Sequence, residues 1–200
     1  MLVQATLAYS ETVEDAARLA RQLVDLSPNS VGTMATVYPS DHEGLPGQPF
    51  ALQEYYASCH ANGSLTLLFL PISRHSQNIL KSPSHAASIS IWSERPAANR
   101  ARVSLIGNVT IYLDDDPVPQ EEDIRKCYLS KHRDARWWLP GDEDAPHLSY
   151  WARFDPHSIY FVGGFGDEHY IGYIPLGLYQ ASGVLSDLKG IAGRVVIQAD

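Results

Sequence analysis

The clearest structural signal in this chain is Leu65-Thr-Leu-Leu-Phe-Leu-Pro-Ile-Ser-Arg-His-Ser-Gln-Asn-Ile-Leu80. Its first half is a short apolar run that is typical of a buried strand, and Pro71 ends that run. Hydroxyl, guanidinium, imidazole and amide side chains then begin a helix. The free N–H groups at such a helix start, with Arg74 beside them, form an anion site of the kind that holds a phosphate. The alternative is that Ser73 only caps the helix and Arg74 is a solvated surface charge.

Working outward from this stretch, the chain alternates short strands with turns and has few helices. The longest β signal contains Gly107, which indicates a bulge or a close backbone approach. Two further strands are predicted around a turn at Asp155-Pro156. This pattern favours a mainly β (α+β) fold, a small barrel with helices at its periphery. The predicted strands are 31–38, 50–56, 65–70, 86–92, 101–112, 150–154 and 158–162, and helices are predicted at 11–26, 73–80 and 120–131.

Composition and charge exclude several classes of protein. The chain has 200 residues, 44% of them hydrophobic and 19% charged, which are values of a globular domain. Its net charge of −8 argues against nucleic acid as a partner, and no apolar run approaches the ~20 residues that span a bilayer. Residues 1–10 lack the basic flank and the cleavage site of a signal peptide. We therefore expect a cytoplasmic protein, or a secreted or endomembrane one if a leader has been removed.

The cysteines and the glycosylation triplets do not decide the compartment. Cys59 and Cys127 allow one disulfide, but free structural thiols are the default expectation for so few cysteines. Two N-x-[ST] triplets begin at Asn62, in a predicted loop, and at Asn108, inside a predicted strand. The first is better placed for modification than the second.

Common catalytic motifs are missing from the chain. There is no G-x-S-x-G elbow, no phosphate-binding G-x-x-x-x-G-K-[ST] loop and no G-x-G-x-x-G after a strand. The eight histidines are scattered and include no H-E-x-x-H, so no metal site is expected. The residues therefore assign no catalytic group.

Several segments together carry a resemblance to a known family. They are Ala16-Ala-Arg18, Leu70-Pro-Ile-Ser73, His132-Arg-Asp-Ala-Arg-Trp137, Trp151-Ala-Arg-Phe154, Ile159-Tyr-Phe-Val-Gly-Gly164 and the segment from Tyr173 to Tyr179. In order and spacing the chain resembles the FMN-binding split-barrel superfamily, which includes pyridoxamine 5′-phosphate oxidase, the haem-utilisation proteins and the CREG family of secreted glycoproteins. The likeness is closest to the CREG-like branch. It implies a split β-barrel domain over residues 10–179, with extensions at 1–9 and 180–200.

The resemblance also implies a cofactor site. In the oxidase branch a Ser-Arg-Lys tripeptide binds the FMN phosphate, and Ser73-Arg74-His75 stands in its place, so neutral His75 would supply less charge than lysine. Trp92 and the run from Arg100 to Gly107 resemble a tryptophan and an Arg-x-x-x-x-Gly strand near the flavin. The implied FMN-binding residues are Ser73, Arg74, His75, Ser76, Asn78, Trp92, Arg100 and Arg102.

A pocket for a small-molecule ligand is predicted beside this site. Its expected residues are Trp151, Gly164 and Phe165, and the loop Pro39–Pro49 and the tract Gly163–Gly166 are predicted to flank its mouth. The alternative is an ordinary solvated loop and a corner turn. One of Trp137 and Trp138 is expected at an interface or lid, because both cannot face inward from one regular strand.

Two functions from different classes remain open. The first is a flavin-dependent oxidoreductase that acts on a small organic molecule and holds FMN at a homodimer interface; the retained Ser73-Arg74 pair favours it. The second is a CREG-like, non-catalytic secreted binding or signalling glycoprotein, favoured by the missing lysine and the branch similarity. Haem binding or degradation is a weaker third, because the haem-utilisation proteins use a C-terminal histidine and none follows His169.

Overall fold

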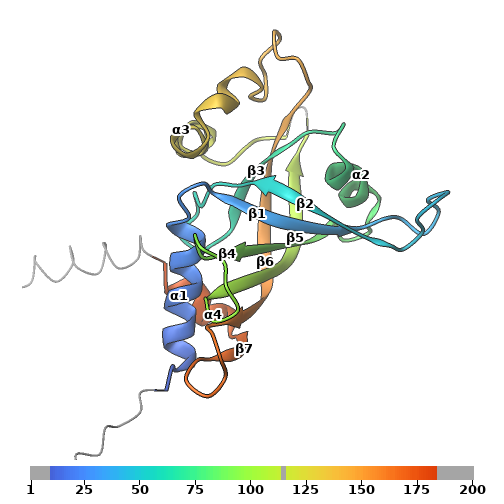
Figure 1. Cartoon of the computed structure of the whole chain (residues 1–200). Helices are drawn as coiled ribbons and strands as arrows, with labels where there is room; N and C mark the ends of the chain where they lie inside the picture. The colour runs from blue at the N-terminus through green and yellow to red at the C-terminus, as the bar shows by residue number, and fades with distance from the viewer. Residues whose placement is uncertain (1–9, 114–115, 184–200) are drawn as a thin grey trace, which may run out of the picture.

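A computed structural model describes residues 10–113 and 116–183 of the chain (Figure 1). Within them, seven strands form one antiparallel sheet in the order β2-β1-β4-β5-β6-β3, and β7 also pairs with β6. The strands are β1 (Val31–Val37), β2 (Pro49–Tyr55), β3 (Leu65–Phe69), β4 (Ala86–Trp92), β5 (Arg102–Tyr112), β6 (Tyr150–Val162) and β7 (Ile171–Ile174). The helices are α1 (Val13–Asp25), α2 (Arg74–Lys81), α3 (Glu121–Lys131), the 3₁₀ helix η1 (Arg133–Trp137) and α4 (Leu176–Ala181).

The sheet curls without closing completely. Its end strands, β2 and β3, are joined through an isolated bridge in which Ala57, just after β2, exchanges two backbone hydrogen bonds with Thr66. Strand β6 pairs with β3 along its first half and with β7 along its second. The prediction of a mainly β split barrel with peripheral helices is therefore confirmed.

The core follows from the alternation of the strands. Inward-facing Met34, Ile89, Leu105 and Phe161 are almost completely buried, and α1 packs Ala16, Ala17 and Ala20 against them. A capping box between Thr12 and Asp15 starts α1. A second, smaller apolar cluster lies under α3 and η1 and contains Leu68, Ile124 and Trp151. The helices thus cover two separate parts of the barrel.

Strand β6 corrects one expectation. The two strands predicted around Asp155-Pro156 are a single strand of 13 residues. Its pairing with β5 shifts between Ile106 and Gly107, and Gly107 lies opposite Pro156. A Cβ at Gly107 would lie 2.2 Å from the Asp155 carbonyl oxygen, so the predicted bulge and close approach are both confirmed. The proline ends no strand because the bulge accommodates its missing N–H.

The cysteines correct a second expectation. Cys59 and Cys127 are bonded to each other rather than free, with their Cα atoms 5.8 Å apart. The bond joins the segment after β2 to α3 across 68 residues of sequence. It therefore fixes the smaller apolar cluster to the barrel.

Trp137 and Trp138 do not lie on a strand. Trp137 ends η1, is 61% exposed and stacks under the Arg136 guanidinium, whereas Trp138 is half-buried against the smaller cluster. One of the two therefore faces outward, as expected, but a 3₁₀ turn causes this. The predicted extension 1–9 and residues 184–200 of the C-terminal extension lie outside the described residues.

Candidate functional site

The start of α2 divides the predicted phosphate-binding residues into two groups. Ser73 is the N-cap: its Oγ accepts a hydrogen bond from the Ser76 N–H at 3.1 Å and donates one to Ser76 Oγ at 2.9 Å. Both hydroxyls are therefore occupied within the helix start. Arg74 points away from this cap, with its Cζ 5.3 Å from the centre of the Tyr38 ring. Within residues 10–113 and 116–183, no carboxylate forms an ion pair with Arg74.

His75 and Asn78 face the barrel interior. Both are almost fully buried and meet at Thr36 of β1: Thr36 Oγ1 lies 3.2 Å from His75 Nδ1 and accepts a hydrogen bond from Asn78 Nδ2 at 3.0 Å. The His75 ring also packs on Phe50, 4.8 Å between centroids. Burial lowers the pKa of His75, opposed by the Leu52 backbone, so its ring is neutral at pH 7.

This placement corrects part of the sequence interpretation. Because His75 and Asn78 point inward, they hold α2 on β1 and cannot contact a ligand on the surface. Ser73 and Ser76 keep a structural role as caps. Of the five residues predicted on this helix, Arg74 is the one whose charge remains available to an anion, together with the first-turn N–H groups of α2.

Trp92, Arg100 and Arg102 form a second group, away from α2. Trp92 lies opposite Arg102 across β4 and β5, and Arg102 donates hydrogen bonds to the carbonyls of Ala98 and Arg100, each at 3.2 Å. The two groups lie at opposite ends of β1: Trp92 lies near Val31, whereas Arg74 lies near Tyr38. Seven residues of strand separate these ends, roughly 23 Å at ~3.3 Å per residue. Arg74 and Trp92 therefore lie on separate parts of one subunit.

The predicted ligand-pocket residues are not brought together. Trp151 is buried in the smaller apolar cluster, where its Nε1 donates a hydrogen bond to Glu121 Oε1 at 3.2 Å. Phe165 is 62% exposed beyond β6. A Cβ at Gly164 would lie 2.4 Å from the His169 ring, so this glycine serves a turn that packs on His169. The corner-turn alternative therefore describes Gly164.

The two segments predicted to flank one pocket mouth also lie apart. In Figure 1 the loop 39–48 extends from the far ends of β1 and β2, whereas residues 163–170 form the loop before β7 at the opposite end of the molecule. Glu11 explains the second segment, because its carboxylate accepts hydrogen bonds from the Tyr170 N–H at 3.4 Å and pairs with His169 Nδ1 at 2.9 Å. These contacts tie the loop to the residue before the α1 cap.

On one face of the sheet most side chains are small, and none of the helices in residues 10–113 and 116–183 is packed on it. Pairing aligns Thr33, Ser90, Ser104, Tyr160 and Tyr173 in one row across β1, β4, β5, β6 and β7. A second row consists of Ala35, Ser88, Ile106 and Ser158. These residues alternate with the core residues of the same strands and are half-buried or exposed. The outer face is thus flat, with aromatic side chains at its edges.

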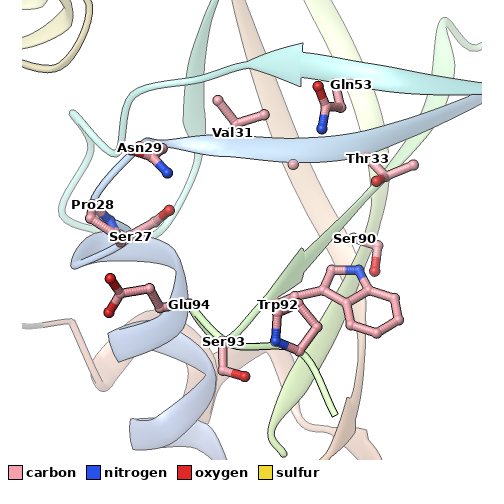
Figure 2. Close-up of a pocket in the computed structure, with 12 residues that line it drawn as sticks. Ser27, Pro28, Asn29, Val31, Thr33, Gln53, Ser90, Trp92, Ser93 and Glu94 are labelled. Carbon is pink, nitrogen blue, oxygen red and sulfur yellow. The ribbon is translucent and has the colours of Figure 1, made fainter. Parts of the chain in front are cut away.

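A pocket of about 440 Å³ lies at the Trp92 end of this face. Figure 2 shows Thr33 and Val31 of β1, Gln53 of β2, and Ser90 and Trp92 of β4 around it, with Glu94 on the far wall. Trp92 is 48% exposed and offers its indole to this space. Trp92 is therefore the one predicted cofactor residue of the sheet that lines this pocket.

A further pocket contains residues that the sequence analysis missed. It lies between β2, β3 and the α3–η1 segment and includes Glu54, Tyr128, His132, Asp134 and Trp138. Burial raises the pKa of Glu54 to about 7, against an ordinary 4.5, and the hydrogen bond from the Tyr55 N–H opposes this rise. Two features of the sequence could have indicated this pocket. Tyr128 and His132 are four residues apart and so share one face of a helix, and Glu54 is an acid at an inward-facing position of β2.

Two further searches of the described ranges were negative. Residues 10–113 and 116–183 contain no cluster of three or more histidine, cysteine, aspartate or glutamate side chains suited to a metal ion. In the same ranges, no helix has the length and apolar character needed to cross a membrane.

The fold and the open sheet face define a split-barrel protein. The family model described as "CREG, beta-barrel" matches residues 11–181, and the chain belongs to this family. The likeness to the CREG branch, expected from the sequence, is thereby confirmed. No curated protein matches the chain significantly.

Solved structures share this fold at low sequence identity. A haem-binding protein from Mycobacterium smegmatis is 21% identical, with a TM-score of 0.61 over 85% of this chain and 60% of that one. A protein of unknown function from Agrobacterium tumefaciens is 18% identical, with a TM-score of 0.57 over 76% and 57%. The haem storage protein HutZ from Vibrio cholerae is 18% identical, with a TM-score of 0.52 over 76% and 94%. This chain therefore spans less than two thirds of the first two proteins.

Proposed function

We propose that this chain forms a homodimer through the open face of its sheet and binds FMN at the edge of that interface, as an oxidoreductase acting on a small organic molecule. The observation that carries the proposal is the face itself, whose two rows have mostly small side chains on β1, β4 and β5 and tyrosines on β6 and β7. Small side chains let a second sheet approach closely, and a twofold axis is the commonest way to pair identical faces.

The position of the charged and aromatic groups supports a site shared between subunits. Arg74 and Trp92 lie at opposite ends of β1. A twofold axis through the face reverses the second subunit, so the Arg74 end of one subunit meets the Trp92 end of its partner. Arg74 with the α2 N–H groups then suits the phosphate, and the indole of Trp92 suits a planar ring.

The residues fit part of an FMN molecule. The free guanidinium fits the phosphate, whereas His75, which stands where the oxidase branch has lysine, is buried and neutral. When bound, FMN supplies the redox chemistry, and the protein's part is to bind it, orient it and exclude water. No described side chain is assigned a proton-transfer role.

The disulfide favours a second candidate function. A bond between Cys59 and Cys127 is typical of an oxidising compartment, and Asn62 and Asn108, the acceptors of both triplets, are exposed. Under this alternative the chain is a secreted binding or signalling glycoprotein without catalysis. A measurement of FMN binding distinguishes these two candidate functions.

Light scattering tests the interface. The wild-type chain should have the mass of two chains of 22.1 kDa at micromolar concentration. Ser104→Arg places a long cation in the middle of the face and should give a monomer that no longer retains FMN, whereas Glu143→Arg, at an exposed position beyond η1, should stay dimeric. A monomeric wild type, or a dimer that Ser104→Arg leaves intact, contradicts the proposal.

A further inference from the structure

The pocket beneath α3 and η1 is distinct from the open sheet face. Its volume is about 210 Å³, and nine residues from β2, β3, α3 and η1 or their ends line it. At ~30 Å³ per water molecule in the liquid, this space equals roughly seven waters. The pocket therefore suits a ligand of a few heavy atoms.

Aromatic rings form one wall of this pocket. The His132 ring lies 4.9 Å from the Tyr128 ring and 5.6 Å from the Tyr55 ring, and Trp138 adds an indole to the lining. His132 Nε2 donates a hydrogen bond to the Tyr56 carbonyl at 2.8 Å, which fixes the ring between the two tyrosines. The faces of tyrosine and tryptophan rings attract cations.

The charges of the pocket all have one sign. Glu54 and Asp134 both line it, and its nine residues include neither lysine nor arginine. Burial raises the pKa of Tyr128, and the Glu54 and Asp134 carboxylates raise it further, which places both acids beside this phenol. His132 and Tyr55 are the other titratable groups in the lining. The lining thus presents acids and aromatic rings with no cation of its own.

We propose that this pocket binds a small organic cation of the methylated ammonium class. The aromatic rings contact the methyl groups and attract the positive charge, and Glu54 and Asp134 neutralise it. A quaternary ammonium needs no hydrogen-bond acceptor, so rings and two carboxylates suffice. The inference does not depend on FMN binding, because these residues lie outside the open sheet face.

Binding must be linked to the ionisation of Glu54. The empty pocket favours neutral Glu54 up to a pH of about 7, whereas a bound cation favours the carboxylate. Binding near neutral pH therefore releases a proton from Glu54. With a free-state pKa of about 7, the affinity should rise about tenfold between pH 6 and pH 8.

The experiment is a titration of the full chain with tetramethylammonium chloride, followed by NMR through the indole N–H of Trp138 and backbone N–H groups. Saturable shifts should be confined to the pocket, and the affinity should rise with pH as above. Glu54→Gln keeps the shape of the side chain and should weaken binding at pH 8 at least tenfold and remove its pH dependence. Glu143→Gln, an exposed acid outside the lining, should bind like the wild type.

Two controls keep the result decisive. tert-Butanol has nearly the shape of tetramethylammonium without its charge and should not bind. Tyr55→Leu removes one ring from an edge strand and should also weaken binding, which tests the pocket even if Glu54→Gln fails to fold. The absence of saturable shifts, equal binding of tert-butanol, or an affinity unchanged from pH 6 to pH 8 would overturn the proposal.

Discussion

The start of α2 and the pocket beneath α3 differ in the kind of charged side chain that they present. At α2, Arg74 lies on the surface against the Tyr38 ring, and no described carboxylate pairs with it. Beneath α3, Glu54 and Asp134 line a partly open pocket that also contains aromatic side chains and includes neither lysine nor arginine. This difference in charge is the reason why the two proposals assign an anionic ligand to the start of α2 and a small cation to the pocket beneath α3.

The ion pair between Arg21 and Asp25 differs from both regions because it is buried. Arg21 of α1 is 1% exposed and donates a hydrogen bond to Asp25 at 3.0 Å, and also to the carbonyls of Ala61 and Tyr179. Its guanidinium lies over the Tyr179 ring of α4. These contacts bind both terminal guanidinium nitrogens of Arg21 within the fold, so the buried charge is paired with Asp25 and does not face a ligand.

The largest predicted effect comes from removing this buried ion pair. Arg21→Met takes away the guanidinium that pairs with Asp25 and donates to the Ala61 and Tyr179 carbonyls, and it should lower the free energy of unfolding by about 3–5 kcal/mol. Chemical denaturation measures the loss. Arg18→Met on the same helix, where the side chain is 56% exposed, should cost less than about 1 kcal/mol. Equal effects would show that the Arg21 contacts carry no special stability.

Removing the disulfide should affect the α3 region alone. The double change Cys59→Ser and Cys127→Ser opens a crosslink across 68 residues, and such bonds typically contribute about 2–4 kcal/mol. Because Cys127 precedes Tyr128 of the pocket wall, hydrogen exchange should rise in α3 and η1. Unchanged exchange in α3, or an equal rise in α1, would contradict this division.

The third prediction concerns pH. A carboxyl whose pKa is raised on folding binds more protons in the folded state, so its contribution to stability falls as pH rises from 4.5 through about 7. This rise in pKa corresponds to at most roughly 3 kcal/mol. Glu54→Gln removes the titration, so its stability relative to the wild type should increase from pH 5 to pH 8. If the free energies of unfolding of the two proteins change in parallel with pH, the raised pKa of Glu54 is contradicted.

The smallest effect concerns the α2 region. Arg74→Ala removes one charge-assisted contact and should cost about 1.5–3 kcal/mol of FMN binding, roughly ten- to a hundredfold in affinity. Fluorescence titration with FMN measures it. Arg125→Ala, an exposed arginine on α3, is the matched control and should leave the affinity unchanged. An unaltered FMN affinity in Arg74→Ala would contradict a phosphate-binding site at the start of α2.

Local patterns predicted the fold well. The strand alternation, the glycine in β5 and the helices α1 to α3 all rest on neighbours in sequence, and Ser73 capped α2 as its hydroxyl allows. The prediction of two strands at 150–154 and 158–162 was wrong, because the bulge beside Gly107 accommodates Pro156 within the single strand β6. The 3₁₀ turn η1 was missed because its sequence has no strong helical period.

The candidate site was predicted only in part because it depends on direction and on distant segments. The resemblance grouped His75 and Asn78 with Arg74 in one phosphate site, yet tertiary packing turned both toward Thr36. Trp151 matched a family segment and is a core residue. Glu54 and Asp134 meet only through the fold, 80 positions apart, and no local pattern joins them.

The most direct test of the account is the absorbance spectrum of the purified protein after incubation with FMN and gel filtration. We expect the dimer fraction to keep flavin bands at about 370 and 450 nm, which belong to the cofactor. We expect Ser104→Arg, passed over the same column, to lose them. A colourless wild-type protein that elutes free of FMN would contradict the proposed function and leave the non-catalytic binding protein in its place.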